Sequence, residues 1–193
     1  MGPLLLQREI RPHGAQSLPR SGWSVEFDAS PWGGGAVLRK GDHCVEYFFT
    51  AWSVEHFPFC VLELGDSKHQ TLWEFLALYM TLLVWGSRFT SASLHLLGDN
   101  TGSLNDALKL SGKAWLMHIA REVSWRTVRG GWAYELSHLP SEHNVVADIL
   151  SRLFAPKPVR LQDVSELSAA KQVEAPRPQD MWSESCHPDR LRA

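Results

Sequence analysis

Alternation of apolar and polar residues predicts a strand-rich beginning to the folded part of the chain. Residues 23–28 alternate in this way, with the period of a half-buried strand. The glycine run at 33–35 and the apolar residues behind it indicate that this strand continues through a bend. After a turn at 40–42, residues 43–52 predict a second strand, and the short apolar run at 59–64 predicts a third.

Longer apolar segments further along the chain predict helices and two more strands. Residues 68–86 are apolar almost all round, which is typical of a helix packed against a sheet. Strands are expected at 93–97 and 132–139, and helices at 101–110, 112–126 and 145–154, the last with Asn144 as its N-cap. A group of strands followed by alternating units implies an α/β fold, with a mixed sheet and helices packed on it.

The composition and periodicity of the chain change at both ends of this patterned region. Residues 1–20 contain three prolines and no clear period, so we interpret them as a leader or linker. Residues 155–193 contain five prolines, and their six basic and six acidic residues cancel, which predicts a largely disordered tail. The folded domain is therefore expected at 21–154.

Composition argues against several classes of protein. The three cysteines are scattered and form no CxxC pair, so neither a disulfide framework nor a zinc site is indicated. A reducing compartment, cytoplasmic or nuclear, is the default expectation. No apolar run approaches the roughly 20 residues of a membrane span, so we expect no membrane partner.

The charge balance is unusual for a protein that would bind nucleic acid by itself. The whole chain carries a formal net charge of −2, and residues 21–154 contain 10 Lys and Arg against 14 Asp and Glu. Nucleic-acid binders usually present a basic face, because neutralised phosphates supply much of their affinity. If the substrate is a nucleic acid, a partner or neighbouring domain is expected to contribute to its binding.

Four acidic residues stand in places that are unfavourable for a carboxylate. Asp28 lies within a predicted strand, and Glu74 lies in the middle of the most apolar predicted helix. Asp99 follows an apolar strand, and Asp148 lies early in a short apolar helix. Each has an ordinary interpretation as well, as a turn residue, a helix cap or a charge near a helix N-terminus. Glu74 fits these least, because burying a lone carboxylate is costly unless it is paired or binds a metal.

The amino-acid sequence around these acids resembles ribonuclease H domains in four segments, which occur in the same order as in that family. Residues 28–37 (DASPWGGGAV) resemble the family's first strand, 70–78 (QTLWEFLAL) the helix that supplies a glutamate, and 98–100 the second Asp at a strand end. Residues 138–152 (HLPSEHNVVADILSR) are the most specific piece. They resemble the closing motif of ribonuclease H domains in Gypsy-type and DIRS-type retrotransposon reverse transcriptases. Together the matches cover about residues 22–154.

The resemblance implies a fold, an activity and a set of metal ligands. The fold would be a ribonuclease H-like mixed five-stranded sheet, with its first three strands antiparallel and helices on both faces. The activity would be hydrolysis of the RNA strand of RNA–DNA hybrids. Two divalent ions, Mg²⁺ or Mn²⁺, would be held by Asp28, Glu74, Asp99 and Asp148. Carboxylates suit this role, because hard cations prefer oxygen ligands and two such ions can serve both oxygens of an in-line displacement.

Further residues and partners follow from the same comparison. Ser30, Gln70 and Asn100 stand beside the acids and could reach the backbone of a hybrid, although each is equally well explained as a cap or a surface residue. Many family members carry a histidine on a loop before the last Asp, and His143 is the nearest candidate here. The acidic balance and the lack of a long basic helical protrusion suggest dependence on an attached reverse-transcriptase polymerase domain.

Three other interpretations remain open from the sequence. The chain could be a catalytically inactive relative that serves as a scaffold, although a scaffold has no need of Glu74. It could be a related nuclease or integrase, but those use three acids with a late glutamate, for which Glu142 is the nearest choice. A binding module without catalysis is the third, and the acidic core argues against it.

Overall fold

The computed structural model describes residues 20–100, 114–158 and 160–182, and these residues form one mixed β-sheet with the order β5-β4-β1-β2-β3-β6. Three antiparallel strands, β1 (Arg20–Ser30), β2 (Gly33–Lys40) and β3 (His43–Ala51), make one half of the sheet. β4 (Ser93–Gly98) runs parallel to β1, and β5 (Tyr134–His138) runs parallel to β4. The two-residue β6 (Lys171–Gln172) pairs parallel with β3 at the opposite edge.

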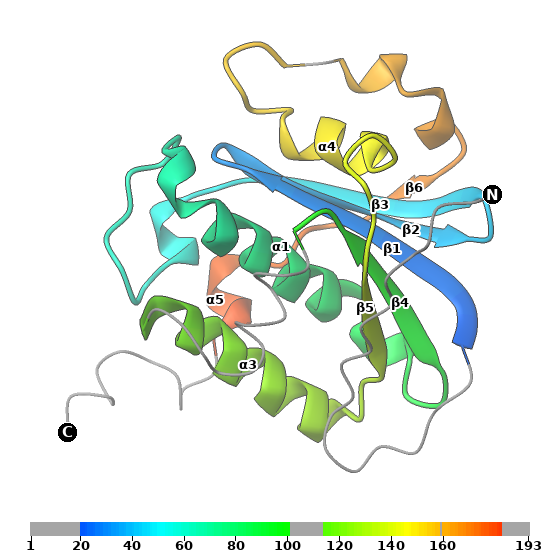
Figure 1. The fold of residues 1–193 in the computed structure, drawn as a ribbon, viewed down its shortest axis with the longest axis horizontal. Helices are drawn as coiled ribbons and strands as arrows, with labels where there is room; N and C mark the ends of the chain where they lie inside the picture. Colours follow the sequence, from blue (N-terminus) through cyan, green and yellow to red (C-terminus); the bar gives the residue numbers. More distant parts are fainter. Residues whose placement is uncertain (1–19, 101–113, 159, 183–193) are drawn as a thin grey trace.

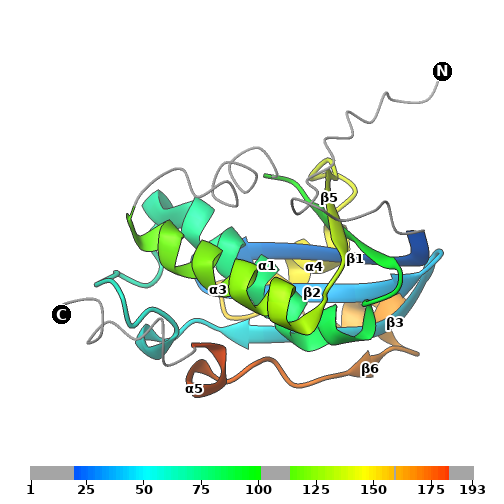
Figure 2. The same cartoon turned by 90° about the horizontal axis from the view of Figure 1, so that it is seen from below.

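Helices cover both faces of this sheet (Figures 1 and 2). α1 (Gln70–Trp85) and α3 (Ala114–Gly130) lie on one face, and α4 (Val145–Ser151) lies on the other. The expectation of a mixed α/β fold, with its first three strands antiparallel and helices on both faces, is thus confirmed. The sheet has six strands rather than the expected five, because β6 from the C-terminal segment is added beside β3. The helix expected at 101–110 lies outside the described residues.

Two of the expected strands were wrong. The glycine run does not continue the first strand through a bend. The chain reverses at Pro31 and Trp32, and the glycines begin β2, where Gly35 pairs with Asp28. The apolar run at 59–64 forms turns rather than a strand, with Val61 wholly exposed. Three strands were expected before β4, and three are present. The numbers agree only because β2 was counted as part of the first strand, while a strand was expected at 59–64 that does not form.

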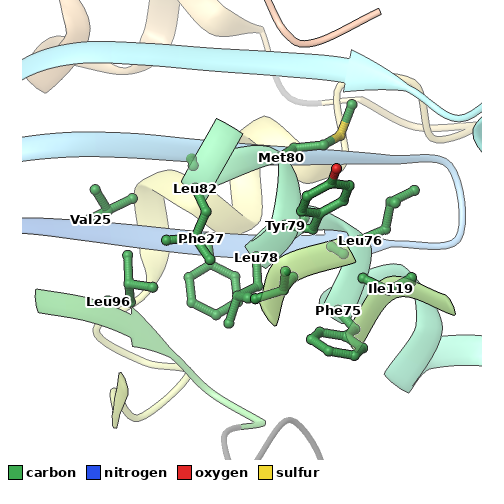
Figure 3. Packing of buried hydrophobic residues seen from close by; sticks show 14 of the residues in the cluster. Val25, Phe27, Phe75, Leu76, Leu78, Tyr79, Met80, Leu82, Leu96 and Ile119 are labelled. Atoms are coloured by element: carbon green, nitrogen blue, oxygen red, sulfur yellow. The ribbon is translucent and has the colours of Figure 1, made fainter. Parts of the chain in front are cut away.

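The main core lies between the sheet and α1 (Figure 3). Twelve of the sixteen residues of α1 are buried, because the helix is enclosed by the sheet on one side and by α3 and the C-terminal segment on the others. Trp73, Tyr79 and Trp85 are all fully buried in it. This enclosure explains why the helix is apolar all round, and it makes the position of Glu74 exceptional.

The glycines of β2 allow α4 to approach the sheet closely. A Cβ added at Gly35 would lie 2.3 Å from the Cβ of Leu150, and one at Gly33 would lie 3.3 Å from the carbonyl oxygen of Ser151. On the other face, a Cβ at Gly34 would lie 2.5 Å from the ring of Trp52. The distances at Gly34 and Gly35 are shorter than any van der Waals contact, so only glycine permits this packing at those two positions.

Replacing Gly35 by alanine is therefore expected to destabilise the protein by roughly 1–3 kcal/mol, because the added methyl group must push α4 away from β2. Thermal unfolding followed by circular dichroism measures the change. Ser124→Ala on the exposed face of α3 is the matched control and should leave stability within about 0.5 kcal/mol. Equal melting curves for Gly35→Ala and the wild type would contradict the close packing of α4.

The segment after residue 154 is packed onto the domain in the part that the structure describes, contrary to the expected disorder. It contributes to a small core with α4 through Val164 and Leu167, then pairs with β3 as β6 and ends in α5 (Pro178–Met181) on the opposite face. Met181 is fully buried in the main core. The segment thus passes round the β3 edge from one face of the sheet to the other (Figure 1).

Polar contacts fix the end of this segment. The hydroxyl of Tyr79 donates to the carbonyl oxygen of Met181, and the Arg126 guanidinium donates to the carbonyl oxygens of Asp180 and Met181 at 3.0 and 3.1 Å. Trp182 packs edge-on against Phe59. The anchors are few in number and lie in a polar sequence, which is why the apolar pattern did not predict them. None of the described helices is both long and apolar enough to cross a membrane.

Candidate active site

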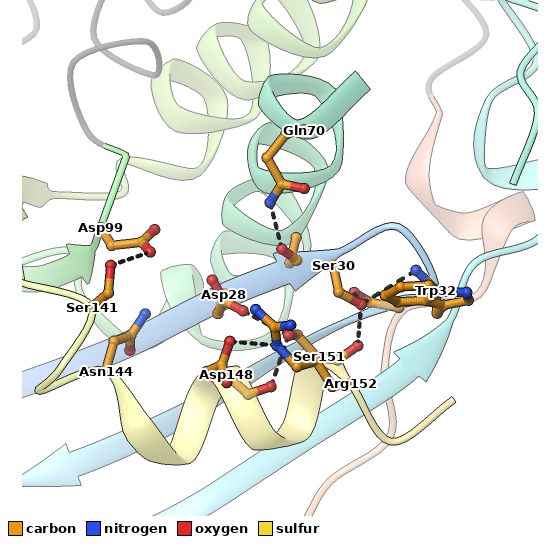
Figure 4. A network of polar contacts seen from close by, with 12 residues as sticks. Asp28, Ser30, Trp32, Gln70, Asp99, Ser141, Asn144, Asp148, Ser151 and Arg152 are labelled. Atoms are coloured by element: carbon orange, nitrogen blue, oxygen red, sulfur yellow. Dashed lines mark hydrogen bonds and ion pairs between the residues drawn. The ribbon is translucent and has the colours of Figure 1, made fainter. Parts of the chain in front are cut away.

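Four elements bring the four acids to one end of the sheet. Asp28 lies near the end of β1, Asp99 directly follows β4, Glu74 lies in the second turn of α1, and Asp148 lies in the first turn of α4. Figure 4 shows Asp28 between Asp99 and Asp148. Asp28 is affected electrostatically by Asp99 and Asp148, and Glu74 by Asp99 and Asp28, so the four carboxylates form one charged group.

The meeting of Asp28 and Asp99 follows from strand register. β1 and β4 are parallel neighbours in which Glu26 pairs with Leu97. Two residues further along each strand stand Asp28 and Asp99. Because parallel strands end at the same edge, the two carboxylates arrive at the same level.

α4 is attached to β1 beside Asp28. Asn144, only 1% exposed, donates from its side-chain amide to the carbonyl oxygen of Phe27 at 3.0 Å. It precedes the helix as expected, but its side chain makes no capping hydrogen bond. The expected capping role was therefore wrong in its chemistry, because the side chain joins the helix to the strand instead. This contact places Asp148 beside the end of β1.

Each of the four carboxylates accepts a hydrogen bond from a neighbouring side chain. The pairs are Ser151 Oγ with Asp28 (2.6 Å), Gln70 Nε2 with Glu74 (2.9 Å), Ser141 Oγ with Asp99 (2.9 Å) and Arg152 Nε with Asp148 (2.6 Å). Every acid is thus held by its own donor. Each carboxylate therefore has an orientation fixed by a neighbouring side chain.

Burial makes the two inner carboxylates poor anions. Asp28 is 6% exposed and Glu74 is 5% exposed. Burial, assisted by the nearby charges of Asp99 and Asp148 and opposed by the hydrogen bond from Ser151, raises the pKa of Asp28 to about 7. Burial likewise raises the pKa of Glu74 to about 7, and Asp99 acts in the same direction. Nearby cations would relieve both effects.

The residue types fit hard divalent cations, although the described residues contain no group of three or more His, Cys, Asp or Glu arranged to hold a metal ion. Glu74 keeps one buried oxygen, Oε2, without a hydrogen-bond partner among the described residues. The ligands on offer at this end of the sheet are carboxylate oxygens, which Mg²⁺ and Mn²⁺ prefer. A buried, unpaired carboxylate oxygen beside three further acids is what such a cation would satisfy.

The structure places the expected substrate-contact residues in different situations. Ser30 is 2% exposed, and its hydroxyl donates to the carbonyl oxygen of Ser151, so a substrate cannot reach it without moving α4. The Gln70 amide donates to the carbonyl oxygen of Ala29 and to Glu74. Asn100 is half-buried beside Glu74, whose pKa it lowers. Gln70 and Asn100 therefore stay candidates for a substrate contact, whereas Ser30 has a structural role.

His143 lies exposed on the turn between β5 and α4. The backbone of this turn is closed by a hydrogen bond from the His143 amide to the carbonyl oxygen of Pro140. The turn also carries Ser141, the donor to Asp99. The imidazole is exposed on this turn, and its expected role beside the last acid stays a prediction.

Sequence reasoning did not single out the donors Ser141, Ser151 and Arg152. A signal existed for two of them. Ser151 and Arg152 follow Asp148 by three and four residues in a predicted helix, a spacing that brings side chains onto one helix face. Ser141 has no such signal, because its contact with Asp99 depends on how two loops meet.

Comparisons with known proteins add two similar solved structures. No protein-family model and no curated protein sequence matches the chain. The structure of LC11-RNase H1 in complex with an RNA/DNA hybrid is similar with a TM-score of 0.49 and 13% identity, over 66% of this chain and 91% of that one. RNase H1 from the halophilic archaeon Halobacterium salinarum NRC-1 is similar with a TM-score of 0.46 and 18% identity, over 68% and 93%. Values this low carry no argument about chemistry, which must come from the site itself.

Proposed function

We propose that the protein is a metal-dependent endonuclease that hydrolyses the RNA strand of RNA–DNA hybrids, with Asp28, Glu74, Asp99 and Asp148 holding two divalent ions. The observation that carries the proposal is the convergence of these four acids, from four separate elements, on one end of the sheet. Two of them are nearly buried in an arrangement that favours bound cations over free carboxylates.

The carboxylates would hold Mg²⁺ or Mn²⁺. When bound, a pair of such ions supplies an activated water and stabilises the leaving 3′ oxygen of a phosphodiester. Asp28 is central, because it is coupled to acids on both sides of it. Asp148 would be the outermost ligand, because its side chain is 43% exposed, and Arg152 holds its Oδ1 in place.

Recognition of the hybrid would rest on its shape and on the 2′-hydroxyl groups of the RNA strand. Gln70 and Asn100 lie beside Glu74, and their side-chain amides would be candidates for contacts with the hybrid. The acidic balance of residues 21–154 supports a further element of the proposal. The domain would act as part of, or be derived from, a retroelement reverse transcriptase, whose polymerase domain contributes to holding the substrate.

Cleavage of an end-labelled RNA–DNA hybrid tests the proposal. We expect cutting of the RNA strand alone, dependent on Mg²⁺ or Mn²⁺, and a loss of at least roughly a hundredfold in Glu74→Gln. Asp42→Asn is the matched control, because Asp42 is an exposed acid on the β2–β3 turn, and its activity should equal that of the wild type.

The outcomes separate the alternatives. Binding of the hybrid without cutting, in a folded wild-type protein supplied with metal, would favour the inactive scaffold. Cutting of double-stranded DNA in preference to the hybrid would favour a related nuclease of the integrase kind. If the wild type neither binds nor cuts, the same assay with a polymerase domain attached tests whether substrate affinity is supplied by a partner.

A further inference from the structure

A buried hydroxyl at the C-terminal end of α4 faces the central carboxylate of the site. Ser151 is fully buried, and its Oγ lies 2.6 Å from Oδ2 of Asp28 and 2.9 Å from the carbonyl oxygen of Asp148. A hydroxyl carries a single proton, and an ionised carboxylate is a stronger acceptor than a peptide carbonyl. When Asp28 is ionised, as it would be beside a bound cation, the proton therefore lies toward Asp28, in a short charge-assisted hydrogen bond.

The position of this hydroxyl is itself fixed by its surroundings. The carbonyl oxygen of Ser151 accepts a hydrogen bond of 2.6 Å from Ser30, which is 2% exposed on β1. The backbone of Ser151 also lies directly over Gly33 and Gly35, where no side chain intervenes. β1 and β2 thus hold the donor, and the donor holds Asp28. Precise placement of this kind is what a metal ligand requires of its supporting residues.

We propose that Ser151 is a positioning residue, which orients the Asp28 carboxylate for metal binding through its hydroxyl. The inference rests on the proposed function and deepens it. Because Ser151 is fully buried and its hydroxyl contacts Asp28, it would act on the site only through Asp28. A purely structural serine would matter for the packing of α4, whereas this one matters for the affinity and the use of the metal ions.

Ser151→Ala separates the two roles, because it keeps the backbone of residue 151 that packs over β2 and removes only the side-chain donor. We expect Mn²⁺ affinity, measured by titration calorimetry without substrate, to fall roughly tenfold or more. In hybrid cleavage, kcat should fall about 10- to 100-fold while KM for the hybrid changes less than about twofold. Thr81→Val is the matched control, because it removes a buried hydroxyl that has no partner among the described residues, in the part of α1 that follows Glu74 by two turns.

The results distinguish a failure of the positioning role from a failure of the proposed function. If the wild type binds Mn²⁺ and cuts, but Ser151→Ala does so with unchanged affinity and kcat, the positioning role is overturned and the nuclease stands. If the wild type binds no Mn²⁺, the proposed function fails first, and the role of Ser151 fails with it. Should Ser151→Ala show no cooperative melting, Ser151→Cys provides the same test, since a thiol of similar size is a much weaker donor.

Discussion

Replacing Asp28 by asparagine is expected to abolish cleavage of the hybrid and, at the same time, to stabilise the metal-free protein. Activity should fall by roughly a thousandfold or more, because the carboxylate that couples both sides of the site is lost. Stability should rise by roughly 2–4 kcal/mol at pH 8, because asparagine has no charge to bury and each unit of pKa shift is worth about 1.4 kcal/mol. Assays of cleavage and of thermal unfolding in the presence of a chelator measure the two effects.

The stability gain should depend on pH in a defined direction. The pKa of Asp28 rises from an ordinary value of 3.8 to about 7 in the folded protein, so between these values the folded state binds a proton that the unfolded state has released. The wild type therefore loses stability as pH rises through this window. The difference between Asp28→Asn and the wild type should be largest above pH 7 and vanish near pH 4. A constant difference across this range would contradict the burial of an uncompensated charge.

Adding metal should narrow or reverse the difference in stability between Asp28→Asn and the wild type. Mg²⁺ or Mn²⁺ bound by the folded wild type raises its stability by about 2.7 kcal/mol at a concentration a hundred times the dissociation constant. Asp28→Asn should gain much less, so that adding metal narrows or inverts the difference between the two proteins. Asp42→Asn, exposed on the β2–β3 turn, should follow the wild type throughout.

Ending the chain after residue 158 is expected to cost the domain most of its stability. The shortened protein loses β6, the buried Met181 and the contacts of Tyr79 and Arg126 with the end of the segment. Emptying the place of one buried methionine alone typically costs about 2–5 kcal/mol, which is comparable with much of the stability of an ordinary domain. We expect a melting temperature lower by at least about 10 °C, or no cooperative transition, in circular dichroism and calorimetry.

A chain ending after Trp182 is the matched control, because it keeps each of these contacts. Met181→Ala in the full chain tests the same anchor without removing the segment, and it should lose stability by about 2–5 kcal/mol. If the chain ending after residue 158 melted like the control, residues 160–182 would be an accessory to the domain rather than a part of it.

The sequence predicted the central features of the site because each leaves a local mark. Asp28 and Asp99 stand at the ends of apolar strands, and parallel neighbours end at one edge. Glu74 is conspicuous because the helix around it is apolar on all sides. For these residues the chemistry could be read from their immediate neighbours in the chain.

Other features could not be predicted, because they depend on contacts between distant segments. A run of three glycines permits a bend, a turn or a close approach, and only the presence of Leu150 over Gly35 selects the last. The apolar run around Val61 has the composition of a strand, but in the described residues it pairs with no strand of the sheet. Met181 is one of a few scattered apolar residues in a polar segment, so its burial leaves no periodic pattern to recognise.

During synthesis, strands β1 to β5, α1 and α4 are made well before Met181, the residue that completes the main core. About thirty residues separate Ser151 from Met181, which at the usual rate of about 5–20 residues per second delays closure by about 2–6 s. Until β6 is made, β3 presents an unpaired edge, and until Met181 is made, the main core is open where that side chain will lie. Exposed strand edges and open cores are what chaperones bind and what aggregates form from. The nascent chain is therefore most vulnerable just after Asp148, the last of the four acids, has been made.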